Sequence, residues 1–343
     1  MKWDVESVPE LAGYSVEWAE PGNYYLSRRN ILYHAIQPAP PFKEIGRVSA
    51  PGWKRLASRL RLSRRLLRFS FYNVIPLAND DIFVTFDKSV GLMRNGTYIE
   101  LSGLARPCRV LRSGCAVDAD GSIYFGEYLA NDERGEMRVY RYRPGLERLE
   151  IAHTFPERSI KHIHGIYVDE HSQSMLCMTG DADSECQILR TYDGFATTEV
   201  VGGGDETWRA VSVLFTADAF YYGTDAEYRD NEIFRVDRRT FERKCLGQVS
   251  GTVFYSKQIG PDLFFGTTAE NAPSQKENVA AIWHVDKEHN LTRVAEFTKD
   301  RWPAGLFQFG TVQFPASDPT EDCLYFNVVA TAGERGTYRL VKK

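Results

Sequence analysis

One pattern recurs along this chain and constrains its fold more than any other feature. Each copy has an apolar strand-like segment, a short turn, a second apolar segment that typically ends in glycine plus an acid, and a polar loop. Six copies can be aligned: VIPLANDDIFVTFD (74–87), CAVDADGSIYFGEY (115–128), GIYVDEHSQSMLCMTGD (165–181), AVSVLFTADAFYYGTD (210–225), VFYSKQIGPDLFFGTT (253–268) and TVQFPASDPTEDCLYFNVV (311–329). Their spacing of about 40 to 55 residues is that of a propeller blade. The sequence therefore predicts an all-β fold, a seven-bladed β-propeller, although six or eight blades would also fit.

The four strands of a blade can be read within a copy. In the clearest copy they are HGIYVD (164–169), SMLCMTG (174–180), CQILRTY (186–192) and TTEVVGG (197–203), and a DG turn joins the last two. The last copy is one strand short, and a strand from within residues 3–18 could complete it. We therefore expect residues 1–343 to form a single propeller domain, with the ring closed between the N- and C-terminal strands.

One segment interrupts this pattern. Residues 53–69, WKRLASRLRLSRRLLRF, contain seven basic residues and no acidic residue. On a helix, Trp53, Leu56, Leu60 and Leu67 would form one stripe, so we expect an inserted basic helix at about 53–69. It could contact an anionic membrane surface or an acidic partner, or it could pack on the propeller with its charges in water.

Composition limits the classes of function. The chain has 343 residues, 43% hydrophobic and 26% charged, with a net charge of −4, which disfavours a nucleic-acid-binding protein. The N-terminus lacks the apolar core of a secretory signal, and no apolar run reaches the length of a membrane span. The six cysteines are scattered without a CxxC pair, so we expect a cytoplasmic protein with reduced thiols.

In a propeller, equivalent loops of every blade meet at one end of the central channel. Residues that are distant in sequence are therefore expected to lie together there. Loops that enter the first strand of each blade share a face with loops that leave the second strand. The side chains expected there from entering loops are Asn73, His162, His164, Trp208, Arg209, Tyr255, Gln308 and Phe309. Those expected from leaving loops include Glu127, Asp181 and Asp225.

The histidine pair in KHIHG (161–165) is the sharpest of these features. His162 and His164 are two residues apart, so in an extended strand their side chains point the same way. Paired imidazoles suit a metal ion or a general base near neutral pH. One histidine could instead cap the strand by bonding to the backbone.

Several carboxylates follow second strands. The segment GDADSE (180–185) has three acids in six residues, which could bind Ca²⁺ through oxygen ligands. Asp181, Glu127 and Asp225 occupy the corresponding position in successive copies, where carboxylates can act as acid and base on a glycosidic bond. They could equally stabilise turns.

The remaining candidates suit substrate binding. Arg209 could hold a substrate carboxylate through two parallel hydrogen bonds. Trp208 and Phe309 could stack on a sugar face, and we assign Gln308 and Asn73 to substrate binding as well.

The segment TYDGFATT (191–198) resembles the Asp-box of sialidase-type (BNR) propellers, a turn of pattern S-x-D-x-G-x-T-W. Asp193 and Thr197 match the pattern, whereas Phe195 replaces its glycine and Thr198 its tryptophan. The box is structural in that family, so the resemblance implies a fold and not an activity.

The histidines, glutamine and arginine expected at the mouth also resemble those of propeller polysaccharide lyases such as oligogalacturonate lyase. Those enzymes hold a metal with histidine and glutamine residues. The resemblance implies a divalent metal, Mn²⁺ or Ca²⁺, at His162, His164 and Gln308.

Together these features predict a carbohydrate-active enzyme that cleaves an acidic glycan or oligosaccharide in the central pocket. In a β-elimination, His162 or His164 removes a proton, Arg209 neutralises the uronate carboxylate, and Tyr255 or Tyr228 protonates the leaving oxygen. In a hydrolysis, two of Glu127, Asp181 and Asp225 serve as acid and base. The alternative is a non-catalytic propeller scaffold that binds a glycan or a peptide.

Overall fold

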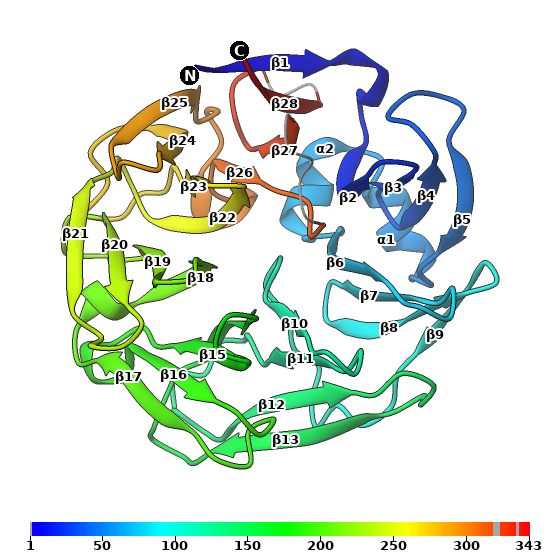
Figure 1. Cartoon of the computed structure of the whole chain (residues 1–343). Helices are drawn as coiled ribbons and strands as arrows, with labels where there is room; N and C mark the ends of the chain where they lie inside the picture. The colour runs from blue at the N-terminus through cyan, green and yellow to red at the C-terminus, as the bar shows by residue number, and fades with distance from the viewer. Residues whose placement is uncertain (1, 318–322, 334–335) are drawn as a thin grey trace. The chain divides into compact units, whose positions relative to one another are not determined.

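The computed structural model describes residues 2–317, 323–333 and 336–343, and their regular elements are mostly β-strands (Figure 1). Part of the repeat copy expected at 311–329, residues 318–322, lies outside the described residues. The chain divides into two compact units. The terminal unit comprises Met1–Ile99, Lys257–Asn271 and Gln275–Lys343, and the middle unit comprises Glu100–Ser256 and Ala272–Ser274.

The middle unit contains three antiparallel sheets of four strands, each built from strands consecutive in sequence. The first consists of β10 (Cys115–Val117), β11 (Ile123–Gly126), β12 (Met137–Tyr142) and β13 (Leu149–Phe155). The second consists of β14 (Ile163–Asp169), β15 (Ser174–Thr179), β16 (Gln187–Thr191) and β17 (Glu199–Gly203). The third consists of β18 (Ala210–Phe215), β19 (Ala219–Thr224), β20 (Glu232–Asp237) and β21 (Arg243–Gln248). Two short 3-10 helices, η2 (Asp183–Glu185) and η3 (Glu206–Trp208), lie in the loops.

The second sheet confirms the strands read from the clearest repeat copy to within two residues at each end. Burial differs systematically across its strands. Every residue of β15 is buried, whereas β17, at the edge of the sheet, has no buried residue. This agrees with the sequence, because SMLCMT is apolar on both faces and EVVGG is not.

The glycine that ends the second strand of a copy has a packing role in the middle unit. A Cβ added at Gly126 would lie 2.3 Å from Cγ2 of Ile163, the first residue of β14. A Cβ at Gly223 would lie 2.4 Å from Cγ2 of Val253. At these two positions the glycine therefore leaves room for an apolar residue at the start of the following repeat, whereas a Cβ at Gly180 would meet Cys186 of its own repeat.

The turn between β16 and β17 is held by the residues of the Asp-box-like segment. Asp193 accepts hydrogen bonds from the backbone N–H and hydroxyl of Thr197, at 2.9 and 2.7 Å. Phe195, at the position of the box glycine, has a left-handed φ of 75°, and its ring is buried against Tyr124. Burial of the ring offsets the strain of this backbone conformation.

The terminal unit contains the remaining sheets. An eight-stranded sheet has the order β2-β3-β4-β5-β9-β8-β7-β6, and its two halves are joined through a single parallel pair, Arg47 and Thr97. Its strands are β2 (Ser15–Glu20), β3 (Asn23–Arg28), β4 (Ile31–Ala35), β5 (Lys43–Arg47), β6 (Phe71–Pro76), β7 (Ile82–Phe86), β8 (Ser89–Arg94) and β9 (Thr97–Glu100). A further sheet consists of β22 (Val253–Ile259), β23 (Asp262–Thr267), β24 (Val279–Val285) and β25 (Leu291–Thr298). The boundaries between the two units fall at the end of β9 and within β22.

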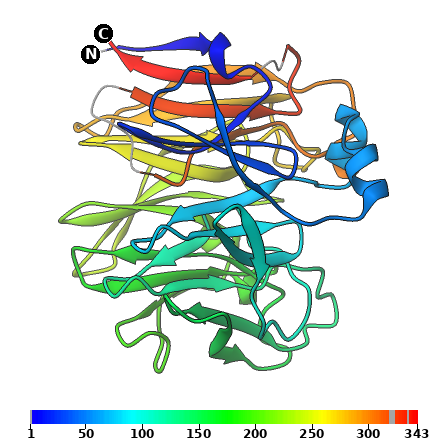
Figure 2. The same ribbon diagram turned by 90° about the vertical axis from the view of Figure 1, so that its right-hand side faces the viewer.

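The last sheet combines both ends of the chain. It has the order β1-β28-β27-β26, in which β1 (Trp3–Val8) pairs antiparallel with β28 (Thr337–Lys342). Figure 2 shows the two terminal strands side by side, and β26 (Thr311–Gln313) and β27 (Cys323–Val329) complete the sheet. A 3-10 helix, η1 (Pro9–Leu11), follows β1. With the eight-stranded sheet counted as two halves, the described strands form seven sets of four. The number of blades stays a prediction. The single-domain organisation of residues 1–343 stays a prediction.

The insertion at 53–69 is helical, but it forms two short helices in place of the single helix expected. They are α1 (Gly52–Ala57) and α2 (Arg61–Leu66). The break occurs because the Ser58 hydroxyl donates to the backbone carbonyl of Arg55 at 2.8 Å and Leu60 is extended. A third short helix, α3 (Ala304–Phe307), contacts α2. None of the helices in the described residues has the length and apolar character needed to cross a membrane.

Candidate metal centre

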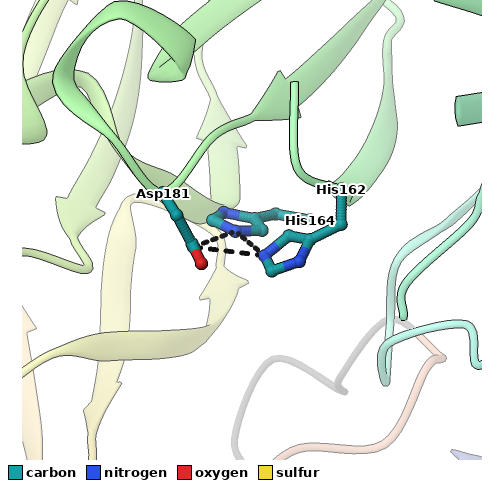
Figure 3. A group of neighbouring side chains, drawn as sticks. All are labelled: His162, His164 and Asp181. Atoms are coloured by element: carbon teal, nitrogen blue, oxygen red, sulfur yellow. Dashed lines mark hydrogen bonds and ion pairs between the residues drawn. The ribbon is translucent and has the colours of Figure 1, made fainter. Parts of the chain in front are cut away.

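The histidine pair lies at the start of the second sheet of the middle unit. His162 directly precedes β14 and His164 is its second residue. In the pairing with β15, Ile163 faces Thr179 and Gly165 faces Met178, so His164 is the extra residue of a β-bulge. A bulge re-aims a side chain, and here both imidazoles turn toward Asp181, which follows β15 (Figure 3).

The three side chains bring their ligand atoms close together. The Nε2 atoms of His162 and His164 are 3.0 Å apart. Oδ1 of Asp181 lies 3.2 Å from Nε2 of His162 and 3.7 Å from Nε2 of His164. Two ligands about 2.1 Å from one metal ion are about 3 Å apart when cis in octahedral geometry and about 3.4 Å apart in tetrahedral geometry. The group therefore has the spacing of three ligands on one face of a metal ion.

Hydrogen bonding sets the tautomer of His164. Its Nδ1 lies 2.9 Å from the carbonyl oxygen of Ala210, and a carbonyl only accepts, so Nδ1 carries the hydrogen. Burial lowers the pKa of His164, which keeps the ring neutral and leaves a lone pair on Nε2. A backbone carbonyl that orients a histidine in this way is typical of metal ligands.

Asp181 completes the group as an ionised carboxylate. Burial alone would raise the pKa of Asp181, but the neighbouring imidazoles of His162 and His164 and the charge of Arg209 hold it well below its usual range. Its Oδ1 is buried and close to three nitrogens, yet none of them meets it with hydrogen-bond geometry. A buried oxygen without a hydrogen-bond partner, such as Oδ1 of Asp181, is explained when an ion completes the site.

Two cations border the group. Arg209 precedes β18 and joins two carboxylates, with Nε 3.0 Å from Oδ2 of Asp225 and a terminal nitrogen 3.1 Å from Oδ1 of Asp181. Burial alone would lower the pKa of Arg209, but Asp225 and Asp181 raise it above its usual value. Nζ of Lys161 lies 3.0 Å from Oδ2 of Asp181, and this hydrogen bond raises the pKa of Lys161. Both cations are therefore charged at neutral pH.

The structure thus places five of the sequence candidates in one connected group: His162, His164, Asp181, Arg209 and Asp225. Two members were missed. Lys161 adjoins the histidine motif, and Tyr128 places its ring 4.3 Å from that of His162. Tyr128 follows Glu127, so a shift of one residue in the leaving loop would have identified it.

Other candidates in the middle unit have different partners. Glu127 is fully buried and accepts hydrogen bonds from Tyr140 at 2.9 Å and Arg106 at 2.7 Å. Trp208 packs against Arg243, whose guanidinium carbon lies 4.4 Å from the ring centroid. Tyr255 lies in β22 and its ring contacts Phe254.

The acids of GDADSE do not gather around one point. Asp181 belongs to the histidine group, whereas Asp183 accepts from the backbone of Glu206 at 3.0 Å. Glu185 pairs with Arg134 at 2.6 Å. A calcium loop built from the three acids is therefore not formed.

Three candidates belong to the terminal unit. Gln308 ends α3 with a left-handed φ of 69°, and Phe309 follows it. Nδ2 of Asn73 donates to Oγ1 of Thr85 at 2.9 Å. The participation of these residues in the site stays a prediction.

Sequence comparisons give no relative. No known family model matches the chain, and neither does any curated protein sequence.

Solved structures do resemble it. Oligogalacturonate lyase in complex with manganese matches at 10% identity with a TM-score of 0.63, over 100% of this chain and 96% of that chain. The extracellular domain of BT4673 from B. thetaiotaomicron matches at 11% identity with a TM-score of 0.59, over 99% of this chain and 40% of that chain. The AfRom2 CNH domain matches at 8% identity with a TM-score of 0.57, over 100% of this chain and 99% of that chain. The chain spans only about two fifths of the BT4673 structure.

At such low identity, likeness shows the fold alone. These neighbours are β-propellers, so the chain has an all-β propeller fold. They include an enzyme and proteins of other kinds, so the fold by itself does not identify an activity. The resemblance of one turn to sialidase-type propellers stays a prediction.

Proposed function

We propose that His162, His164 and Asp181 hold a divalent metal ion in a site that cleaves an acidic oligosaccharide by β-elimination. The observation that carries the proposal is the convergence of three ligand atoms, with Nε2 of His164 fixed as a lone-pair donor. Two imidazoles and one carboxylate suit a first-row transition ion such as Mn²⁺, whereas Ca²⁺ prefers oxygen ligands. The manganese complex of oligogalacturonate lyase supports this choice by likeness of fold.

The charges around the site favour an anionic substrate. The carboxylates of Asp181 and Asp225 are matched by Arg209 and Lys161, and His164 is neutral. A divalent ion therefore adds a surplus of positive charge, even when the exposed Asp132 beside Lys161 is counted. A uronate carboxylate would be attracted to such a site.

In the elimination, a solvent hydroxide removes the proton at C5 of a uronate and becomes water, the electron pair forms a C4=C5 bond, the C4–O bond breaks and the leaving oxygen takes up a proton. A bound divalent ion supplies charge that neutralises the uronate carboxylate and acidifies this proton. The histidines use Nε2 as ligands, so in this proposal neither is the base. Lys161 and Arg209 orient the anionic sugar, and Tyr128, beside His162, replaces Tyr255 and Tyr228 as the proton donor.

The geometry gives less support to hydrolysis by two carboxylates. Glu127 is enclosed by Tyr140 and Arg106, and Asp225 is paired with Arg209. A non-catalytic glycan-binding propeller remains the alternative, because the same metal and cations could bind an acidic sugar without cleaving it. A cytoplasmic location is also part of the proposal and rests on the sequence.

The test is an elimination assay. Protein treated with a chelator and reloaded with Mn²⁺ is incubated with oligogalacturonate, and the ultraviolet absorbance of the new C4=C5 bond is followed. We expect absorbance to rise only in the reloaded sample, and Asp181→Asn to abolish the rise. The matched control is His34→Ala, since His34 is a half-buried histidine of the terminal unit bonded to Asn23. New reducing ends without absorbance would indicate hydrolysis, and metal-dependent binding without products would favour the glycan-binding alternative.

A further inference from the structure

The helical insertion presents its large apolar side chains to solvent. Trp53, Leu56 and Leu60 are 61%, 63% and 68% exposed, and Leu66 is 52% exposed. Leu306 of α3, the helix that contacts α2, is 60% exposed. We call these five side chains the insertion patch. Several large apolar side chains exposed on one short segment commonly mark an interaction surface.

Polar residues attach the insertion to its own unit. Arg65 is 4% exposed, donates from Nε to the carbonyl of Phe307 at 2.7 Å, and forms an ion pair with Asp300 at 2.5 Å. Nζ of Lys54 lies 3.1 Å from Oδ2 of Asp87. A surface helix of a globular protein normally buries its apolar stripe and exposes its charges. Here two charged residues face the protein and Leu56, Leu60 and Leu66 face water, so the arrangement is inverted over most of the two helices.

The surroundings of the insertion patch are basic. Arg55, Arg59 and Arg61 are exposed, and residues 52–69 contain no acid. Arg301, just before α3, is exposed too. In Figure 2 the two helices, coloured light blue, stand at one side of their unit, clear of its sheets.

We propose that the insertion patch docks on the surface of a bilayer containing anionic phospholipid. Tryptophan and leucine side chains enter the interface between headgroups and acyl chains, while flanking arginines remain at the level of anionic headgroups. A bilayer accepts scattered apolar side chains interleaved with arginine, whereas a protein partner must supply a surface shaped to them. This proposal is independent of the metal centre.

The experiment is cosedimentation of the full chain with vesicles. We expect binding to phosphatidylcholine vesicles that contain about 30% phosphatidylserine, much weaker binding to phosphatidylcholine alone, and weakening by salt. Leu56→Ser/Leu60→Ser and Arg55→Glu/Arg59→Glu should each lower the bound fraction at least tenfold. Val200→Ser/Ile151→Ser is the matched control, since these apolar residues are 60% and 51% exposed on strands of the middle unit. That variant should bind like the unchanged protein.

All of the substituted side chains are exposed, so the variants should fold, and circular dichroism verifies this. Absence of binding to the phosphatidylserine vesicles at low salt would overturn the proposal, as would equal loss in the control variant. A dimer in solution that Leu56→Ser/Leu60→Ser dissociates, without vesicle binding, would assign the patch to a second copy of the chain instead.

Discussion

Replacement of His164 by alanine is expected to lower the affinity of the protein for Mn²⁺ at least 100-fold. Loss of an outer partner of a metal ligand already costs about 10- to 100-fold, and His164 supplies a ligand atom itself. Its Nε2 lone pair is pre-set by the bond from Nδ1 to Ala210, so no other side chain can replace it without reorganisation. Isothermal titration of the chelator-treated protein with MnCl₂ measures the change.

A second variant keeps this prediction independent of folding. Asp181→Asn preserves the volume of the side chain and removes its charge, and it should weaken Mn²⁺ binding to a similar degree. His34→Ala, in the terminal unit, should bind like the unchanged protein. Retention of full affinity by both His164→Ala and Asp181→Asn would show that the metal, if bound, is held elsewhere.

Gly126→Ala is expected to lower the free energy of unfolding by about 3 kcal/mol, the upper end of the range for overpacking. The new Cβ would lie 2.3 Å from Cγ2 and 2.4 Å from Cβ of Ile163. Cβ is fixed to the backbone, so Ile163 cannot move aside by a change of rotamer. The start of β14 would have to shift, and with it both histidines. Denaturation in urea measures the change.

The matched control for this prediction is Gly305→Ala. A Cβ at Gly305 meets nothing within 4 Å, and the residue lies in α3. Alanine there should leave stability unchanged or raise it by about 0.5 to 1 kcal/mol, since it lowers the entropy of the unfolded chain. Equal stability of Gly126→Ala and the unchanged protein would refute the packing role assigned to the recurring glycine.

The repeat was enough to predict the sheets, because the copies share short apolar strands separated by polar turns. The glycine that ends the second strand was visible as a pattern, but its purpose was not. Only the three-dimensional structure shows that Gly126 faces Ile163, a residue 37 positions further along the chain. Similarly, Phe195 reads as a mismatch to the Asp-box glycine, yet it adopts the left-handed φ that the glycine would supply.

The site was predictable in part. Topology assigned His162, His164, Asp181 and Arg209 to neighbouring loops, and the structure places them in contact. Sequence could not distinguish Glu127, whose side chain is enclosed, from Tyr128, whose ring reaches the histidines. That difference depends on the direction in which each loop residue points. The alternation of side chains predicts direction only within a strand, and these two residues follow the strand.

The insertion shows that a local pattern does not predict long-range contacts. Its helical periodicity was read correctly, but one helix was expected where two form. Hydrophobic spacing alone assigned the apolar stripe, whereas the buried ion pair of Arg65 with Asp300 decides which side faces the protein. A contact between residues 235 positions apart cannot be inferred from a local pattern.

The most direct test of the central claim is a crystal structure of the protein soaked in MnCl₂, with diffraction data collected at the manganese absorption edge. We predict an anomalous peak within about 2.3 Å of Nε2 of His162, Nε2 of His164 and a carboxylate oxygen of Asp181. A peak elsewhere, or hydrogen bonds among the three side chains with no peak at saturating manganese, would contradict the metal centre.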